Sequence, residues 1–354
     1  MKFDEFSHYR NLPDYSSGKA GNRERGAALI LALLVLSVVT STAVFMAQNF
    51  ELNLRRVESG FISTQSQEYL RSTESIAIRV LVQDNATTTS ANTKIDHYGE
   101  FWAKKPTPFK VPGGWVMASL DDAQAKFNIN NLRTKPSPNN RATGDAKRFS
   151  TAQKRFIRLL QTFEEIELSQ QEAIEITEAL IDWLDADDKP TGFGGAESNF
   201  YSDKGYRPAN RPMESTSELR LVRYIGAELY NLLLEHCIAL PDETDININT
   251  ASTELLRTLN HANDLQPLSA IEAAQLTDSR SSESFDSVSA FLNHPVMTDL
   301  MASADVNADG LNVGSQYFLL SSKVSLNHQI RESRSLVKRT DNGTRIIRRS
   351  RGVL

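Results

Sequence analysis

The stretch "RERGAALILALLVLSVVTSTAVFMAQ", residues 23–48, decides how the chain begins to fold. It contains no charged residue between Ala27 and Ala47. Because an α-helix rises about 1.5 Å per residue, this run covers about 30 Å, the thickness of the hydrocarbon core of a bilayer. The sequence therefore predicts a membrane-spanning helix over residues 27–47.

A conventional secretory signal peptide is the alternative for the same stretch. Its apolar core is usually about 7–15 residues long and ends at a cleavage site of the small-x-small type. Thr42, Ala43 and Ala47 could form such a site. The apolar run is longer than a signal peptide needs, so we expect the helix to remain on the protein as an anchor.

Apolar residues continue at helical spacing beyond the membrane-spanning run. Four of them follow one another at spacings of four, three and four: Phe50, Leu54, Val57 and Phe61. No proline interrupts the pattern before Asp84, so a single helix over residues 27–84 is expected. Its part over residues 48–84 is amphipathic and needs a surface to pack on.

Strand patterns lie on both sides of a block of helical patterns. Alternating apolar and polar residues predict strands over residues 115–120 and 125–129, joined by a turn at "DDAQ", and further strands over residues 315–326, 332–340 and 344–350. The sequence Asp341-Asn342-Gly343 is typical of a hairpin turn. Between the two groups of strands, a 3.6-residue periodicity and the capping boxes of Ser169 with Glu172 and of Ser215 with Glu218 predict helices.

This order of elements predicts an α+β fold, in which a long helix packs on a small antiparallel sheet and a large all-α domain is inserted between strands. The expected parts are a leader over residues 1–26, a membrane-spanning helix over 27–47, an amphipathic helix over 48–84, an α/β head over 85–147 and 309–354, and the inserted domain over 148–308.

The composition excludes some classes of protein. A net charge of −5 gives no general attraction to nucleic acid, and the single Cys237 excludes an intramolecular disulfide. We find no P-loop, GxSxG or HExxH motif and no ligand spacing among the six histidines, so no enzyme class is indicated.

Basic residues gather at the C-terminal end. Nine of them stand against two acidic residues, Glu332 and Asp341: Lys323, Arg331, Arg334, Lys338, Arg339, Arg345, Arg348, Arg349 and Arg351. They form either a solvated strand face or a contact with lipid headgroups or an acidic partner.

The segment "IDWLDADDKPTGFGGAESNFY", residues 181–201, is the densest polar site. Asp185, Asp187 and Asp188 follow a helix, and Glu197 and Asn199 return after a glycine-rich bend. Carboxylates this close repel one another unless a cation lies between them, and hard oxygen ligands without histidine or cysteine favour Ca²⁺ over Zn²⁺. We predict a structural calcium site here; the alternative is a solvated acidic loop.

A second metal site is possible in "DVNADG", residues 305–310. Asp305, Asn307 and Asp309 match the start of an EF-hand loop. The twelfth position is Gln316, where that loop needs a glutamate. A turn rich in Asx residues that leads into a strand is therefore the alternative.

The segments "ININTASTELLRTLN" and "FDSVSAFL", residues 246–260 and 285–292, resemble a helix-hairpin-helix or SAM-like module. DNA-binding versions present the amides of a glycine-containing hairpin to phosphates. That place reads "HANDLQPL" here, without glycine, so we expect no nucleic-acid binding but a protein-binding or structural role. Asn249 and Thr250 are expected to cap the following helix.

Several of these motifs together resemble the protein K family of minor pseudopilins of type II secretion systems. They are the Gly26-Ala27 junction at the start of the apolar run, "FNINNL" at 127–132, "DWLDADD" at 182–188 followed by "GAE", "RPANRPMESTSELRLV" at 207–222 and "ININTAS" at 246–252. Other pilin-like proteins carry glutamate at the fifth mature position. Leu31 stands there, and protein K is the member in which that glutamate is missing.

The resemblance implies several properties. A prepilin peptidase would cleave between Gly26 and Ala27, and the new N-terminus would be methylated. The mature chain would be a single-pass protein of the bacterial inner membrane with its C-terminal domain in the periplasm. Calcium would be held by Asp185, Asp187, Asp188 and Glu197.

The resemblance also implies a role and partners. The chain would sit at the tip of the pseudopilus with minor pseudopilins I and J, contact other pseudopilins and the inner-membrane assembly platform, and help to initiate assembly and export of folded proteins. Three alternatives remain: a DNA-binding or DNA-uptake protein, suggested by the hairpin-like module and the basic tail; a membrane-anchored hydrolase that uses the acidic loop; and a minor pilin of a type IV pilus or DNA-uptake system.

Overall fold

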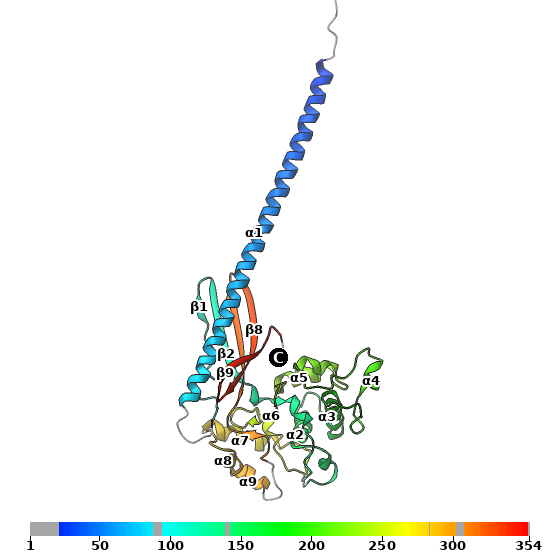
Figure 1. Ribbon diagram of the computed structural model, residues 1–354, viewed down its shortest axis with the longest axis vertical. Helices are drawn as coiled ribbons and strands as arrows, with labels where there is room; N and C mark the ends of the chain where they lie inside the picture. Colours follow the sequence, from blue (N-terminus) through cyan, green and yellow to red (C-terminus); the bar gives the residue numbers. More distant parts are fainter. Residues whose placement is uncertain (1–20, 88–93, 139–141, 283, 302–307, 353–354) are drawn as a thin grey trace, which may run out of the picture. The chain divides into compact units, whose positions relative to one another are not determined.

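The computed structural model describes residues 21–87, 94–138, 142–282, 284–301 and 308–352, drawn as a ribbon in Figure 1. The chain forms two compact units that divide between Thr64 and Gln65. Helix α1 (Gly21–Thr87) contains residues of both units. It confirms the expected long N-terminal helix and begins before Ala27, where the apolar run starts.

Over residues 27–47, in the first unit, α1 carries no charged side chain on any side. Every residue from Gly26 to Phe61 is exposed. One window of the helix reaches a mean hydropathy of 2.5, so the helix is long and apolar enough to cross a membrane. A helix that is apolar all round is typical of a membrane span.

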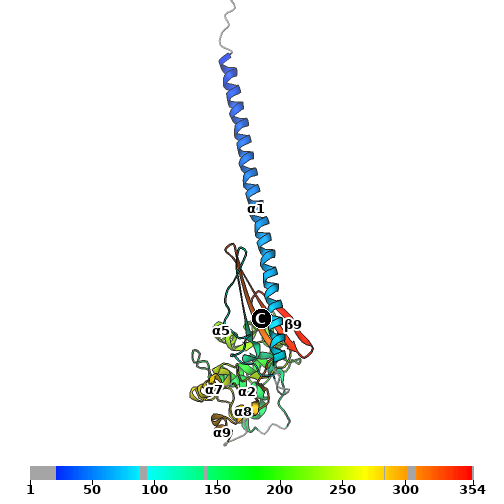
Figure 2. The ribbon, with the colours of Figure 1, turned by 90° about the vertical axis from the view of Figure 1, so that its left-hand side faces the viewer.

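The second unit is built on one antiparallel sheet. Its strands lie in the order β1 (Phe109–Val111), β2 (Gly114–Asp122), β7 (Tyr317–Leu326), β8 (Gln329–Thr340) and β9 (Gly343–Ser350). We call the face that packs on α1 the front face: Ala77 and Leu81 of α1 form one apolar cluster with Phe318, Leu320 and Val337. Figures 1 and 2 show the end of α1 lying along these strands.

The chain between Asp122 and Tyr317 forms the insertion. Its helices are α2 (Thr151–Leu160), α3 (Gln170–Leu184), α4 (Ser198–Ser202), α5 (Ala227–His236), α6 (Thr253–Leu256), α7 (Ala270–Ser282), α8 (Val288–Leu292), α9 (Pro295–Met301) and the 3-10 helices η1 (Ala123–Ala125), η2 (Ile129–Arg133), η3 (Gly144–Arg148) and η4 (Thr216–Leu221). It also contains two parallel strand pairs, which the sequence did not predict: β3 (Phe127–Asn128) with β4 (Cys237–Ile238), and β5 (Ile246–Asn247) with β6 (Leu311–Asn312). The insertion is mainly but not entirely helical.

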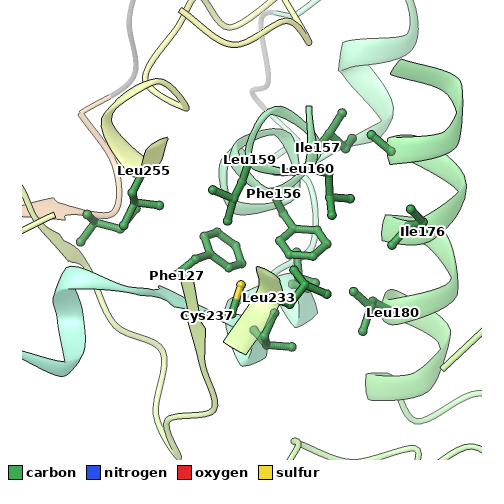
Figure 3. Packing of buried hydrophobic residues seen from close by; sticks show 14 of the residues in the cluster. Phe127, Phe156, Ile157, Leu159, Leu160, Ile176, Leu180, Leu233, Cys237 and Leu255 are labelled. Carbon is green, nitrogen blue, oxygen red and sulfur yellow. The ribbon is translucent and has the colours of Figure 1, made fainter. Parts of the chain in front are cut away.

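The core of the insertion lies between α2 and α3 (Figure 3). Phe156, Leu159 and Leu180 are fully buried there, and the rings of Phe127 and Phe156 lie 5.3 Å apart. Each such side chain contributes about 1.5–3 kcal/mol by burial. The predicted capping box of Ser169 with Glu172 is present at the start of α3.

The expected hairpin over residues 115–129 is wrong. The side chain of Asp122 accepts a hydrogen bond from the Gln124 amide at 2.8 Å and starts η1, which turns the chain out of the sheet. Phe127 and Asn128 therefore pair with Cys237 and Ile238 and not with β2. A short polar cap has overridden the alternation of apolar residues.

The motif "FNINNL" holds a distant loop. Asn128 accepts a hydrogen bond from the Leu240 amide at 3.1 Å and donates to the carbonyl of Asp242 at 2.8 Å. Asn130 donates to Leu240 and accepts from Met213. These amide side chains replace strand pairing over residues 239–244, so the motif is structural.

A buried polar cluster joins the insertion to the sheet. Asp122 Oδ2 accepts hydrogen bonds from Asn247 at 2.9 Å, from Thr250 at 2.6 Å and from Ser315 at 2.6 Å. The expected capping role of Thr250 is therefore wrong, because Ser252 caps α6. The partners come from two segments, residues 247–250 and the segment of Ser315 just before β7, so this joint fixes the insertion on the sheet.

Many of the C-terminal basic residues form ion pairs within the second unit. Their ion pairs are Lys323–Glu332, Lys338–Asp242, Arg339 with Asp84 and Asp96, Arg348–Glu214 and Arg349–Glu74. Arg331, Arg334, Arg345 and Arg351 are exposed.

Candidate metal centre

The end of α3 and the loop after it build the candidate metal centre. Glu178 and Asp182 lie one turn apart on α3 and accept hydrogen bonds from the loop amides of Gly194 at 2.8 Å and Thr191 at 3.0 Å. A Cβ atom on Gly194 would lie 2.3 Å from the Cα atom of Glu175, so only glycine fits against the helix. The loop is thereby folded back so that Glu197 lies beside the end of α3.

Three of the predicted residues come together. One carboxylate oxygen each of Asp185, Asp187 and Glu197 lies within 4.8 Å of the others. Glu197 is only 3% exposed, yet neither of its oxygens has a hydrogen-bond partner among the described residues, and the same holds for Oδ1 of Asp185. Buried carboxylate oxygens without donors are costly unless a cation lies between them.

The electrostatics agree with this geometry. Burial, and then the charges of Asp182 and Asp185, raise the pKa of Glu197 to about 8. Burial, and then the charge of Asp187, raise the pKa of Asp185 to about 6. A bound cation would reverse both shifts by stabilising the ionised forms.

The residues fit calcium. Ca²⁺ takes about six to eight oxygen ligands and accepts irregular geometry. Asp185, Asp187 and Glu197 would hold the ion, and Oδ1 of Asn210 is a further buried oxygen without a partner among the described residues. The ion would neutralise the repulsion and fix the loop after α3.

Sequence reasoning missed Asn210. Its side chain donates to the carbonyl of Asp187 at 3.1 Å and its amide to the carbonyl of Trp183 at 3.0 Å. Its φ of 47° lies in the left-handed region, which asparagine tolerates better than most residues. An asparagine between the two prolines of "RPANRP" was the available signal.

Two predicted ligands have other positions. The side chain of Ser198, and then its amide, which donates to Asp188 at 3.1 Å, lower the pKa of the Asp188 carboxyl group. Asn199 is exposed, and its carbonyl accepts the hydroxyl of Ser202. Neither belongs to the group of converging carboxylates.

The second predicted metal site cannot be built from the described residues. Asp305 and Asn307 lie outside them. Asp309 is exposed and precedes Gly310, whose carbonyl accepts a hydrogen bond from Arg155 at 3.2 Å. The EF-hand hypothesis therefore stays a prediction.

Another acidic cluster has its charge balanced by protein groups. Asp84, Asp96 and Glu100 also bring carboxylate oxygens within 4.8 Å. Arg339 donates to Asp84 at 2.8 Å and to Asp96 at 2.6 Å, and the Trp102 indole donates to Glu100 at 2.6 Å. This cluster is an internal ion-pair network.

Comparisons with known proteins agree with the sequence motifs. The family model "Type II secretion system (T2SS), protein K" matches residues 125–242 and 246–314, both of which lie in the insertion. The protein K of Pseudomonas aeruginosa is 32% identical over 93% of this chain and 93% of its own length. That of Klebsiella pneumoniae is 30% identical over 94% of this chain and 98% of its own length.

A solved structure supports the same relationship. This chain is similar, with a TM-score of 0.69 and 26% identity, to a chain of the GspK-GspI-GspJ complex from the type 2 secretion system of enterotoxigenic Escherichia coli. The match covers 83% of this chain and 98% of that one. Together with the family match, this similarity shows that the chain belongs to the protein K family of type II secretion systems and is a minor pseudopilin.

Proposed function

We propose that this minor pseudopilin is the tip subunit of a periplasmic pseudopilus, where it binds minor pseudopilins I and J, helps to initiate assembly and supports export of folded proteins. The similarity to a chain solved in complex with GspI and GspJ supports these partners. The family match names type II secretion and gives no support to the type IV pilus alternative.

The position of the insertion is the observation that supports the assignment of this chain to the tip. Thr73 of α1 is bonded to Ser322 near the middle of β7, and Asp84 pairs with Arg339, which donates to the carbonyl of Ser315 at the C-terminal end of the insertion. The helix therefore runs along the sheet toward the end where the insertion leaves β2 and returns to β7. A bulky domain at that end would prevent another subunit from stacking beyond it.

The first part of α1 supports the proposed membrane placement. The leader over residues 1–26 would lie in the cytoplasm, and a prepilin peptidase would cleave between Gly26 and Ala27. Both residues are exposed. The apolar helix after Ala27 would then anchor the mature, N-methylated chain in the inner membrane, with the second unit in the periplasm.

Calcium is proposed as a structural ligand of the same protein. Asp185, Asp187 and Glu197, with Asn210, form the site. The ion would order the loop of residues 185–197 on the surface of the insertion, and it has no catalytic role in this proposal.

Labelling of isolated pseudopili tests the tip assignment. An epitope placed in the insertion at the exposed Phe193 should be found at one end of each filament by immunogold electron microscopy. Label along the whole length would contradict the assignment. An epitope on a major subunit serves as the control for antibody access along the filament.

A further inference from the structure

The back face of the sheet, opposite α1, has two halves with different coverage. Side chains of directly paired residues point to the same face. In the half next to the insertion, Tyr317 and Leu336 form an apolar cluster with Ala123, Ile238 and Leu240 of the insertion. We call this the covered half.

Cations of the covered half bind acids of the insertion. Lys338 pairs with Asp242, and Arg348 pairs with Glu214 at 3.0 Å. The hydroxyl of Tyr317 also bonds to Asp242. The sheet therefore holds the insertion through an apolar centre with cations at its margin, each opposite a carboxylate.

We call the other half of the back face the open half. It also combines apolar side chains with cations, but no segment of the insertion is described as packing on it. The strand register places three rows of side chains on it: Lys110, Trp115, Ser325 and Ile330; Met117, Lys323 and Glu332; Ser119, Ser321 and Arg334. A groove of about 370 Å³ crosses the latter two rows and reaches Arg351. Ile330 is 52% exposed and Trp115 is half-buried, so apolar surface faces outward.

The charge of the open half is positive on a chain whose net charge is negative. Four cations, Lys110, Lys323, Arg334 and Arg351, stand beside one carboxylate, Glu332, which pairs with Lys323 at 2.8 Å. Asp121 lies at the margin, where the charge of Lys126 acts on it. No ion pair joins Lys110, Arg334 or Arg351 to a carboxylate in the part of the chain that the structure describes.

We propose that the open half binds an acidic surface of the pair of minor pseudopilins I and J, with carboxylates opposite Lys110, Arg334 and Arg351 around an apolar contact on Trp115 and Ile330. Charge complementarity with the positive face favours an acidic partner. In the covered half, the same sheet already binds the acids of the insertion through an apolar centre with cations at its margin. The proposal rests on the proposed function for the identity of the partner.

Binding of the I–J pair to the full-length chain in detergent tests this surface. Arg334→Glu and Arg351→Glu together should raise the Kd at least about tenfold at 50 mM NaCl, and the effect should shrink at 500 mM because salt screens exposed charges. Trp115→Ala should weaken binding at both salt concentrations. If that variant fails to fold, Ile330→Ala on the same row replaces it.

Arg331→Glu is the matched control. Arg331 lies on the same strand and is also exposed, but it pairs with Val324 and so points to the front face. Its reversal should change the Kd less than about twofold. Equal losses from Arg331 and from the Arg334 and Arg351 pair would show a general charge effect and overturn the inference.

The result also separates the inference from the proposed function. If the unchanged chain binds the I–J pair, while the Trp115 and Arg334–Arg351 variants bind as tightly, then I and J use another surface and only the inference falls. If the unchanged chain does not bind the pair at all, the proposed partners are wrong and both fall. Equal melting temperatures of all variants confirm that folding is intact.

Discussion

Two clusters of three carboxylates differ in what surrounds them. In the cluster of Asp84, Asp96 and Glu100, an arginine and an indole already donate to the oxygens. In that of Asp185, Asp187 and Glu197, buried oxygens have no donor among the described residues. The number and spacing of carboxylates therefore do not identify a metal site. The buried oxygens without donors are what make the second cluster the candidate metal site.

The largest expected effect comes from breaking the first cluster. Arg339 is 3% exposed, and Arg339→Met would leave the buried Asp96 and the half-buried Asp84 without their cation. We expect a loss of about 3–5 kcal/mol in the free energy of unfolding. Urea unfolding of residues 65–354 measures it. Arg71→Met, at the ion pair with Glu68 in which both side chains are exposed, is the control and should cost less than about 1 kcal/mol.

The second cluster should respond to calcium and the first should not. An excess of Ca²⁺ of about 100-fold over its Kd would add about 2.7 kcal/mol to the free energy of unfolding. The melting temperature should therefore rise relative to EDTA, and Glu197→Gln should abolish the rise. Equal melting curves with EDTA and with calcium would refute the metal site. The Arg339 variant, if folded, should keep the full response.

The pH dependence sharpens the same comparison. Because burial raises the pKa of Glu197 to about 8 from an ordinary 4.5, the folded, metal-free chain holds this proton at a higher pH than the unfolded chain. The contribution of this group to the free energy of unfolding is therefore fully present below pH 4.5 and is lost as the pH rises through about 8. In EDTA, the urea midpoint should decrease from pH 5 to pH 8.

The two clusters can be separated within this pH profile. Burial also raises the pKa of Glu100, to about 7, with the same sign. Glu197→Gln should remove the part of the decrease in the urea midpoint that extends to pH 8. The part that comes from Glu100 should remain. An unchanged profile in this variant would argue against the raised pKa of Glu197.

The smallest expected effect concerns the two predicted ligands outside the cluster. Asp188 bonds to the Ser198 amide, and Asn199 is exposed. Asp188→Asn and Asn199→Ala should therefore leave the calcium-dependent rise in melting temperature unchanged. Loss of the rise in either variant would show that the loop rearranges when the ion binds.

The sequence predicted the parts of the fold that local chemistry determines. The long apolar helix, the capping box at Ser169 and the β8–β9 hairpin follow from spacing and turn residues that are close in sequence. The pairing of β3 with β4 could not be predicted, because it depends on Asn128 and Asn130 binding a loop about a hundred residues away.

The candidate site shows the same limit. Asp185, Asp187 and Glu197 were found because a glycine-rich bend returns the chain within a dozen residues. Asn210 was missed because its place depends on a left-handed backbone and on contacts with α3. Asn199 was chosen for proximity in sequence alone.

The joint around Asp122 has a mechanical consequence. The insertion is attached through the adjacent ends of β2 and β7, so a pull on it would open this strand pair one hydrogen bond at a time. Asn247, Thr250 and Ser315 all bind one carboxylate at that point. These three bonds lie at the first pair of residues to be pulled apart, so they would have to break before β2 and β7 could begin to separate.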